Sequence, residues 1–226
     1  MEIFIERCVL YLANFLAILI ILPLHEFAHA FAAVKCGDDT PKLAGRYTLN
    51  PFAHFDPIGL VMMILIRFGW AKPVPVNPDN FRNRKSGCIW VSIAGVLVNL
   101  TFAIVICPLC IYSYKLFYIQ SDWARYLILL IQYFIASLFW INVSLFVFNM
   151  LPIYPLDGFR LLESLTGGRG KFFNFVRRYG FYILLGIFVL GYIADWANIP
   201  YLDVIGYLSQ KLGNGIILLW QSILKI

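Results

Sequence analysis

Two histidines and a glutamate near the N-terminus form the pattern HExxH, which consists of His25, Glu26 and His29. Residues four positions apart lie on one face of an α-helix, so both imidazoles of this pattern can bind the same ion. In zinc hydrolases with this pattern, the glutamate acts as a general base beside the metal without binding it. We therefore predict that His25 and His29 are metal ligands and that Glu26 is the catalytic acid and base.

A catalytic zinc site has three protein ligands and one open position, so a third donor is needed. We assign this role to Asp157, which follows a long apolar run and lies next to a segment interrupted by Pro152 and Pro155. Prolines end a helix, and irregular backbone is tolerated at membrane depth where protein covers it or where it lines a wet cavity. Together with an ionised Glu26, Asp157 would neutralise one zinc ion, and we expect one Zn²⁺ per chain.

The expected reaction is hydrolysis, in which zinc activates water and polarises the scissile carbonyl while Glu26 carries the proton to the leaving amine. Asn149 precedes Asp157 in the same segment, and its amide could donate a hydrogen bond to the developing oxyanion. The alternative is that Asn149 caps the end of a helix. For His54, which lies next to Asp56, we favour a structural or capping role over zinc binding.

These residues belong to a chain of 226 residues, of which 61% are hydrophobic and 13% are charged. Soluble domains have roughly half apolar and a quarter charged residues, and a chain of this size could not bury the excess apolar surface. We therefore predict a protein embedded in the lipid bilayer. The formal net charge is +6, but Lys and Arg fall in short blocks between apolar runs, which indicates membrane orientation and not nucleic-acid binding.

Four apolar runs are long enough to cross a hydrocarbon core of about 30 Å as helices. They are residues 9–34, 88–112, 126–151 and 179–196. The run 58–66 is too short to span, and we predict a re-entrant or interfacial segment there. Residues 204–226 include a lysine and two glycines, and either a tilted span or an interfacial helix fits them. The predicted fold is an all-α polytopic membrane protein that forms one domain over residues 1–226.

The distribution of Lys and Arg predicts how these helices are oriented, because cytoplasmic connections are enriched in both. The segment 35–85 and the segment after residue 151 hold most of them, so we place both in the cytoplasm. At about 1.5 Å per helical residue, His29 lies about 9 Å and His25 about 15 Å from Lys35, at the cytoplasmic boundary of the first span. Asp157 follows the cytoplasmic end of the third span, so all three expected ligands approach the same leaflet.

Five stretches, taken together, resemble the site-2 protease family of membrane-embedded zinc metalloproteases, in a short form without PDZ or CBS domains. They are HEFAHA from His25, TLNPFAHFDPIG from Thr48, GWAKPVPVNP from Gly69, SIAGVLVN from Ser92 and NMLPIYPLDG from Asn149. The resemblance implies that His25, His29 and Asp157 bind zinc. It also implies that Glu26 is the catalytic acid and base and that Asn149 contacts the substrate.

The resemblance further implies a β-hairpin on the cytoplasmic side, at Gly45 to Asn50, which could pair with an unwound substrate by strand addition. The residues of this stretch alone predict only an irregular loop. The chain departs from the family in having Val96 where proline is usual, and in a shorter apolar stretch before Gly69. Neither difference affects an expected zinc ligand.

We therefore expect an intramembrane zinc metalloprotease that cleaves transmembrane proteins near the cytoplasmic leaflet, as in regulated intramembrane proteolysis. The expected location is the plasma membrane of a prokaryote, with the site towards the cytoplasm. One alternative is a metal transporter, because intramembrane His and Asp also line ion pathways, although a transporter needs a path to both sides. The other is a catalytically silent membrane scaffold, which would not need Glu26.

Overall fold

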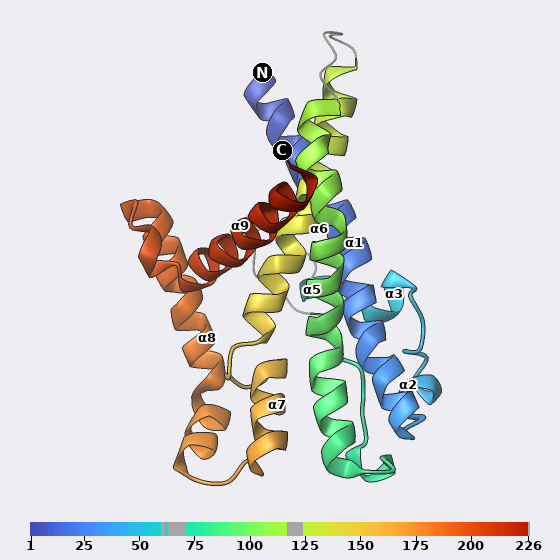
Figure 1. The fold of residues 1–226 in the computed structure, drawn as a ribbon. Helices are drawn as coiled ribbons and strands as arrows, with labels where there is room; N and C mark the ends of the chain where they lie inside the picture. Colours follow the sequence, from blue (N-terminus) through green and yellow to red (C-terminus); the bar gives the residue numbers. More distant parts are fainter. Residues whose placement is uncertain (60–61, 63–70, 117–123, 226) are drawn as a thin grey trace.

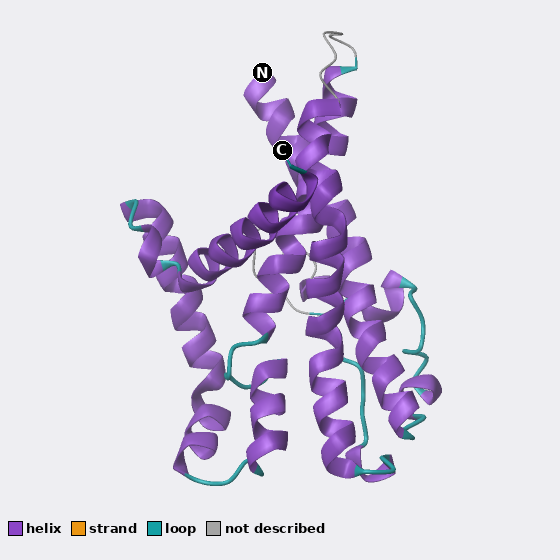
Figure 2. Ribbon diagram, in the orientation of Figure 1, coloured by secondary structure: helices purple, strands orange, loops and turns teal. Residues whose placement is uncertain are grey.

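Helices joined by loops make up the whole of the described chain (Figures 1 and 2). The structure is a computed structural model and describes residues 1–59, 62, 71–116 and 124–225, among which no strand occurs. Four helices are long and apolar enough to cross a membrane. They are α1 (Glu2–Cys36), α5 (Arg84–Leu116), α6 (Arg125–Asn149) and α8 (Lys171–Ala197). The predicted all-α class with at least four such helices is confirmed.

The centre of the molecule is a bundle of α1, α5 and α6, which pack against one another along most of their length (Figure 1). Small side chains lie where these helices meet, and Ala17 and Ala33 on α1 and Ala103 on α5 are fully buried. In a membrane, small residues allow helix backbones to approach closely and gain van der Waals contact. Helix α1, which carries the HExxH pattern, is therefore held tightly against both of its neighbours.

Short helices lie between α1 and α5 along the chain; the first two pack against α1 and the third packs against α5 (Figure 1). They are α2 (Thr40–Leu43), α3 (Pro51–His54) and the 3₁₀ helix η1 (Pro78–Asn80). Residues 45–50 form turns and bends, so the β-hairpin implied by the family resemblance is not confirmed; one bridge pairs Phe55 with Ala71. Most of the predicted re-entrant run 58–66 lies outside the described residues.

Helix α7 (Asp157–Thr166) begins at the predicted third ligand and packs against α5. The sequence interpretation did not include this helix and treated the surroundings of Asp157 as irregular backbone. The irregular part is shorter than expected, because it ends at Leu156, the residue that caps α7.

The C-terminal part consists of α8, the 3₁₀ helix η2 (Pro200–Leu202) and α9 (Val204–Leu224). Helix α9 runs obliquely back across the bundle and packs on α5 and α6 (Figure 1). Its Trp220 donates a hydrogen bond from Nε1 to the carbonyl of Ile104 at 2.9 Å, and Gly213 lies against the ring of Trp140. These contacts fix α9 to the bundle.

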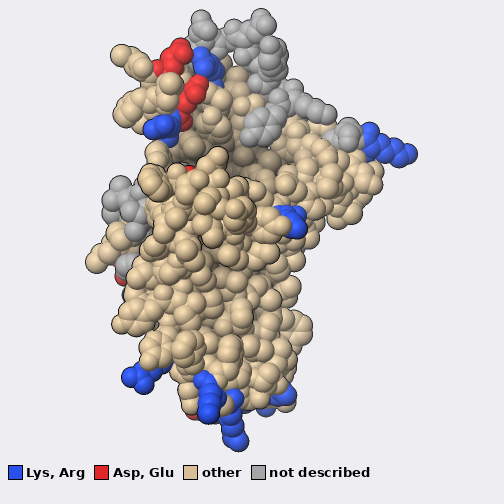
Figure 3. Space-filling view, turned by 90° about the vertical axis from the view of Figure 1, so that its left-hand side faces the viewer, with Lys and Arg blue, Asp and Glu red and all other residues tan. Residues whose placement is uncertain are grey.

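Charged side chains collect at the two ends of the molecule, and the face shown in Figure 3 carries few between them. The lower end has mostly Lys and Arg; Figure 1 places the end of α1, the start of α5 and the α7–α8 turn there. At the opposite end, Arg125 at the start of α6 forms ion pairs with Glu2 and Glu6 of α1. An uncharged belt between charged ends suits a protein that crosses a bilayer.

Candidate metal centre

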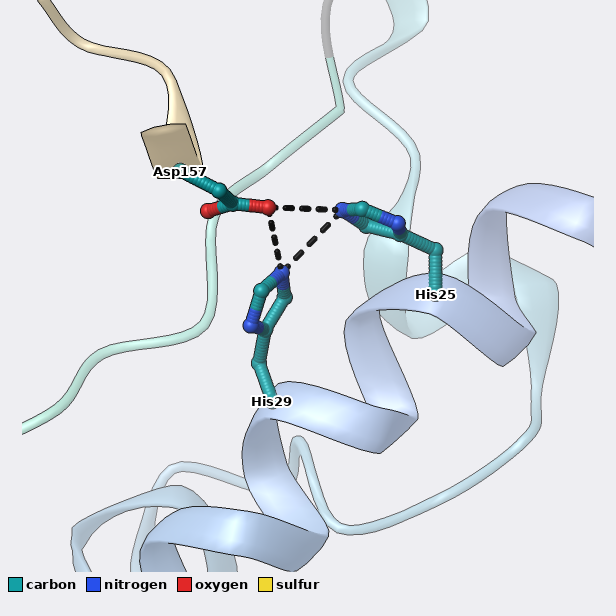
Figure 4. A group of neighbouring side chains, drawn as sticks. All are labelled: His25, His29 and Asp157. Atoms are coloured by element: carbon teal, nitrogen blue, oxygen red, sulfur yellow. Dashed lines mark hydrogen bonds and ion pairs between the residues drawn. The ribbon is translucent and has the colours of Figure 1, made fainter. Parts of the chain in front are cut away.

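Three of the predicted site residues meet in the interior of the bundle (Figure 4). His25 and His29 project from α1 towards Asp157, and all three side chains are buried. The Nε2 atoms of the two histidines are 3.1 Å apart. Oδ2 of Asp157 lies 3.4 Å from Nε2 of His25 and 3.2 Å from Nε2 of His29. The three donor atoms therefore form a nearly equilateral triangle.

The dimensions of this triangle fit a zinc ion. Donor atoms about 2.0–2.1 Å from a tetrahedral zinc ion are separated by roughly 3.3 Å, and the observed separations are 3.1, 3.4 and 3.2 Å. Apart from the two imidazoles, no described group donates a hydrogen bond to the buried Oδ2 of Asp157. Two imidazole nitrogens and one carboxylate oxygen form a donor set used by catalytic zinc sites, which keep a fourth position open.

Asp157 reaches the histidines because the chain folds back sharply between α6 and α7. A Cβ atom on Gly158 would lie 2.3 Å from the carbonyl oxygen of Met150, so the turn requires glycine at this position. Burial opposes ionisation of Asp157, but a bound metal ion would favour its carboxylate form. The residue is therefore suited to be an anionic ligand.

Glu26 lies beside the ligands without joining their triangle. Its Oε2 atom accepts a hydrogen bond from the backbone N–H of Val74 at 3.2 Å, across a separation of 48 residues. Val74 is buried between Pro73 and Pro75, in the stretch that leads towards η1. The carboxylate is half-buried and is oriented by this contact, which the sequence pattern did not reveal.

The stretch around Val74, which contacts Glu26, is itself anchored by Asp38, just after the end of α1. Asp38 is fully buried and accepts hydrogen bonds from the backbone N–H of Asn77 at 2.7 Å and from Nδ2 of Asn80 at 2.8 Å. Thr40 donates two more, from its backbone N–H and its hydroxyl. Burial disfavours the charged form of Asp38, but these hydrogen bonds outweigh it and lower its pKa. The connection between α1 and α5 is thus fixed at both Asp38 and Glu26.

Helix α5 supplies a second layer of contacts that the sequence interpretation missed. Nδ1 of His25 lies 3.2 Å from Oδ1 of Asn99, and Nδ1 of His29 lies 2.7 Å from the carbonyl oxygen of Val91. The sequence feature that could have revealed these contacts is the spacing of Val91, Gly95 and Asn99 at intervals of four, which puts them on one face of a helix.

Two other residues considered in the sequence, Asn149 and His54, lie outside the group of three metal-binding side chains. Asn149 is the last residue of α6, and its Nδ2 donates to the carbonyl of Leu145 at 3.0 Å, so its side chain is bonded to its own helix. Its contact with substrate stays a prediction. His54 is fully buried, with Nε2 at 2.8 Å from the carbonyl oxygen of Thr48, and it is not part of the metal-binding group.

The chain is similar to known proteins over most of its length. Residues 13–191 match the model of Peptidase family M50. The "Putative zinc metalloprotease YwhC" of Bacillus subtilis is 40% identical over 187 residues, which cover 80% of this chain and 83% of that protein. The "Putative zinc metalloprotease Rip2" of Mycolicibacterium smegmatis is 29% identical over 185 residues, covering 77% of this chain and 66% of Rip2. No solved structure matched.

The family model covers most of the chain, and the similarity to YwhC extends over most of both proteins. The four apolar helices place the chain in a membrane, and the family acts with zinc on polypeptide substrates. This chain therefore belongs to peptidase family M50, the site-2 protease family, and is a zinc metalloprotease of the membrane.

Proposed function

We propose that this protease cleaves transmembrane proteins inside the membrane, near the cytoplasmic leaflet, with His25, His29 and Asp157 as its zinc ligands. The observation that carries the proposal is the convergence of three buried donor atoms from α1 and α7, at separations of 3.1 to 3.4 Å. Polar and ionisable groups are costly in a membrane interior unless a partner compensates for them. A bound cation would satisfy all three at once.

The other residues of the site would carry the proton transfers. Bound zinc would supply the electrophile that activates water and polarises the scissile carbonyl. Glu26 would accept a proton from the attacking water and donate it to the leaving amide nitrogen. The N–H of Val74 restrains one oxygen of this carboxylate, which orients the group for both transfers. Asn149, at the end of α6, would contact the substrate.

The depth of the site supports a cytoplasmic position and a membrane-embedded substrate. His25 and His29 lie in the half of α1 that ends at Cys36. This half of α1 is directed towards the lower end of the molecule in Figure 1, where Lys and Arg collect in Figure 3. The positive-inside rule assigns this end to the cytoplasm. The relatives are bacterial proteins, so we place the chain in a bacterial plasma membrane, as one protease domain over residues 1–226.

The proposal is tested by reconstituting the wild type and three variants into liposomes with a single-span substrate. Glu26→Gln should keep about one zinc ion per chain, and cleavage should fall by at least about 10²–10⁴-fold, because the amide cannot accept the proton. Asp157→Ala should lose both zinc and cleavage, because a ligand is missing. His54→Ala is the control and should keep its zinc. Elemental analysis and fragment sequencing measure the two properties.

Two outcomes would contradict the proposal. Full zinc occupancy in Asp157→Ala would remove this residue from the metal site. Lack of cleavage by the wild type of every substrate in a broad panel of single-span proteins would contradict cleavage of transmembrane proteins inside the membrane.

A further inference from the structure

We infer that Asn99 of α5 is a positioning residue that fixes the tautomer of His25 and so prepares its Nε2 atom to bind the metal. The inference rests on the proposed metal site. Asn99 is fully buried, and its Oδ1 atom lies 3.2 Å from Nδ1 of His25, across a separation of 74 residues. The other ring nitrogen of His25 faces Asp157 at 3.4 Å. Asn99 therefore contacts this ligand on the side away from the metal position.

The chemistry of the amide determines which tautomer is favoured. A carbonyl oxygen only accepts hydrogen bonds, so the contact with Oδ1 requires a proton on Nδ1 of His25. The neutral ring then has its lone pair on Nε2, which is the atom that faces Asp157. If the amide were rotated, Nδ2 would donate to Nδ1 and the ring proton would move to Nε2, where it would block metal binding. The orientation of one amide thus decides whether His25 can be a ligand.

The two histidines differ in how this outer contact is made. His29 uses the backbone carbonyl of Val91, at 2.7 Å, which no substitution on α5 removes directly. His25 depends on a side chain. The Nδ2 atom of Asn99 has no partner among the described residues, so His25 is the hydrogen-bonding neighbour that the structure gives this buried amide. A buried amide is costly in an apolar helix, which argues for a role at the site.

The inference predicts the effect of substitutions on zinc affinity, measured by competition with a chelator. Asn99→Leu has a similar size but cannot accept a hydrogen bond, and it should weaken zinc binding by about 10–100-fold, as losses of outer contacts to metal ligands do. Asn99→Asp keeps the acceptor and should bind zinc within a few-fold of the wild type, or more tightly. Asn142→Leu is the matched control, because Asn142 is also buried but donates to Leu138 within α6. It should leave zinc affinity unchanged.

A second readout separates positioning from general damage. In the Co²⁺-substituted protein, visible absorption reports the geometry of the ligands, and Asn99→Leu should change this spectrum while Asn99→Asp and Asn142→Leu should not. Wild-type zinc affinity in a folded Asn99→Leu would overturn the inference. If Asn99→Leu does not fold, Asn99→Asp decides, because a loss of affinity there would show that the acceptor is not what matters. His25→Ala tests the site itself: unchanged zinc binding there would refute the proposed site.

Discussion

Gly95 of α5 and His29 of α1 approach so closely that no side chain fits between them. A Cβ atom on Gly95 would lie 2.4 Å from Nε2 of His29 and 2.6 Å from Cε1 of His25. Contacts below 3.0 Å are not tolerated, so one of these groups would have to move. Both imidazoles are buried, and their Nδ1 atoms contact Asn99 and Val91 of α5, which leaves the rings little freedom to do so. The glycine thus allows α5 to support the proposed ligands.

Gly95→Ala should therefore weaken zinc binding by about 10-fold or more, since overpacking a tight site costs about 1–3 kcal/mol. The helix itself should tolerate the change, because alanine has a higher helix propensity than glycine by about 1 kcal/mol. Chelator competition measures the affinity, and thermal unfolding checks the fold. Gly186→Ala on α8 is the matched control, because a Cβ atom there meets nothing within 4 Å. Equal zinc affinity in the two variants would mean that the histidines are free to move.

Orientation in the membrane gives a second prediction. In a variant without the five native cysteines, Arg84→Cys at the start of α5 and Lys171→Cys at the start of α8 should react with an impermeant maleimide only from the cytoplasmic side. Asp122→Cys, in the connection between α5 and α6, should react from outside. Right-side-out and inverted vesicles distinguish the two sides. Labelling of the first two positions from outside would invert the topology and place the metal site in the other leaflet.

The local part of the site was predictable from the sequence. His25 and His29 are one helical turn apart, so their shared face follows from the pattern alone, and the long apolar runs identify the four membrane-length helices. Helix ends were less predictable: α5 begins at Arg84 and α8 at Lys171, before the apolar runs that suggested them. A helix can extend beyond its apolar run through polar residues that contact water, and hydropathy does not mark where such an extension ends.

Contacts between distant segments were not predictable in this way. The pairing of His25 with Asn99 depends on the register between α1 and α5, and the contact of Val74 with Glu26 depends on how a proline-rich loop folds back. Neither is encoded in the spacing of nearby residues. Asp157 was identified by its charge in an apolar setting, but helix α7, which begins there, is short and lacks the length that makes a periodic pattern clear.

Asp38 provides the third prediction, because it anchors the stretch that contacts Glu26. Its carboxylate accepts hydrogen bonds from Thr40, Asn77 and Asn80, and an amide in its place would put an N–H group against these donors. Asp38→Asn should lower the free energy of unfolding by about 2 kcal/mol or more, which corresponds to an unfolding temperature lower by roughly 4–8 °C. Cleavage should also decrease, because Val74 would no longer be held in place to orient Glu26. Calorimetry and a substrate-cleavage assay measure the two effects.

Asp39→Asn is the control for this variant, because the Asp39 side chain is 64% exposed and its ion pair with Lys42 contributes little.

The dependence of stability on pH follows from the lowered pKa of Asp38. A carboxyl group whose pKa is lower in the folded state stabilises the fold above its unfolded pKa, and this stabilisation is lost as the pH falls through the folded pKa. The difference in the free energy of unfolding between the wild type and Asp38→Asn should therefore be the same at pH 7 and about pH 5. This difference should shrink as the pH falls below 3.8, the ordinary pKa of an aspartate side chain. A difference that stays constant down to the folded pKa and beyond would show that Asp38 acts through packing and not through its charge.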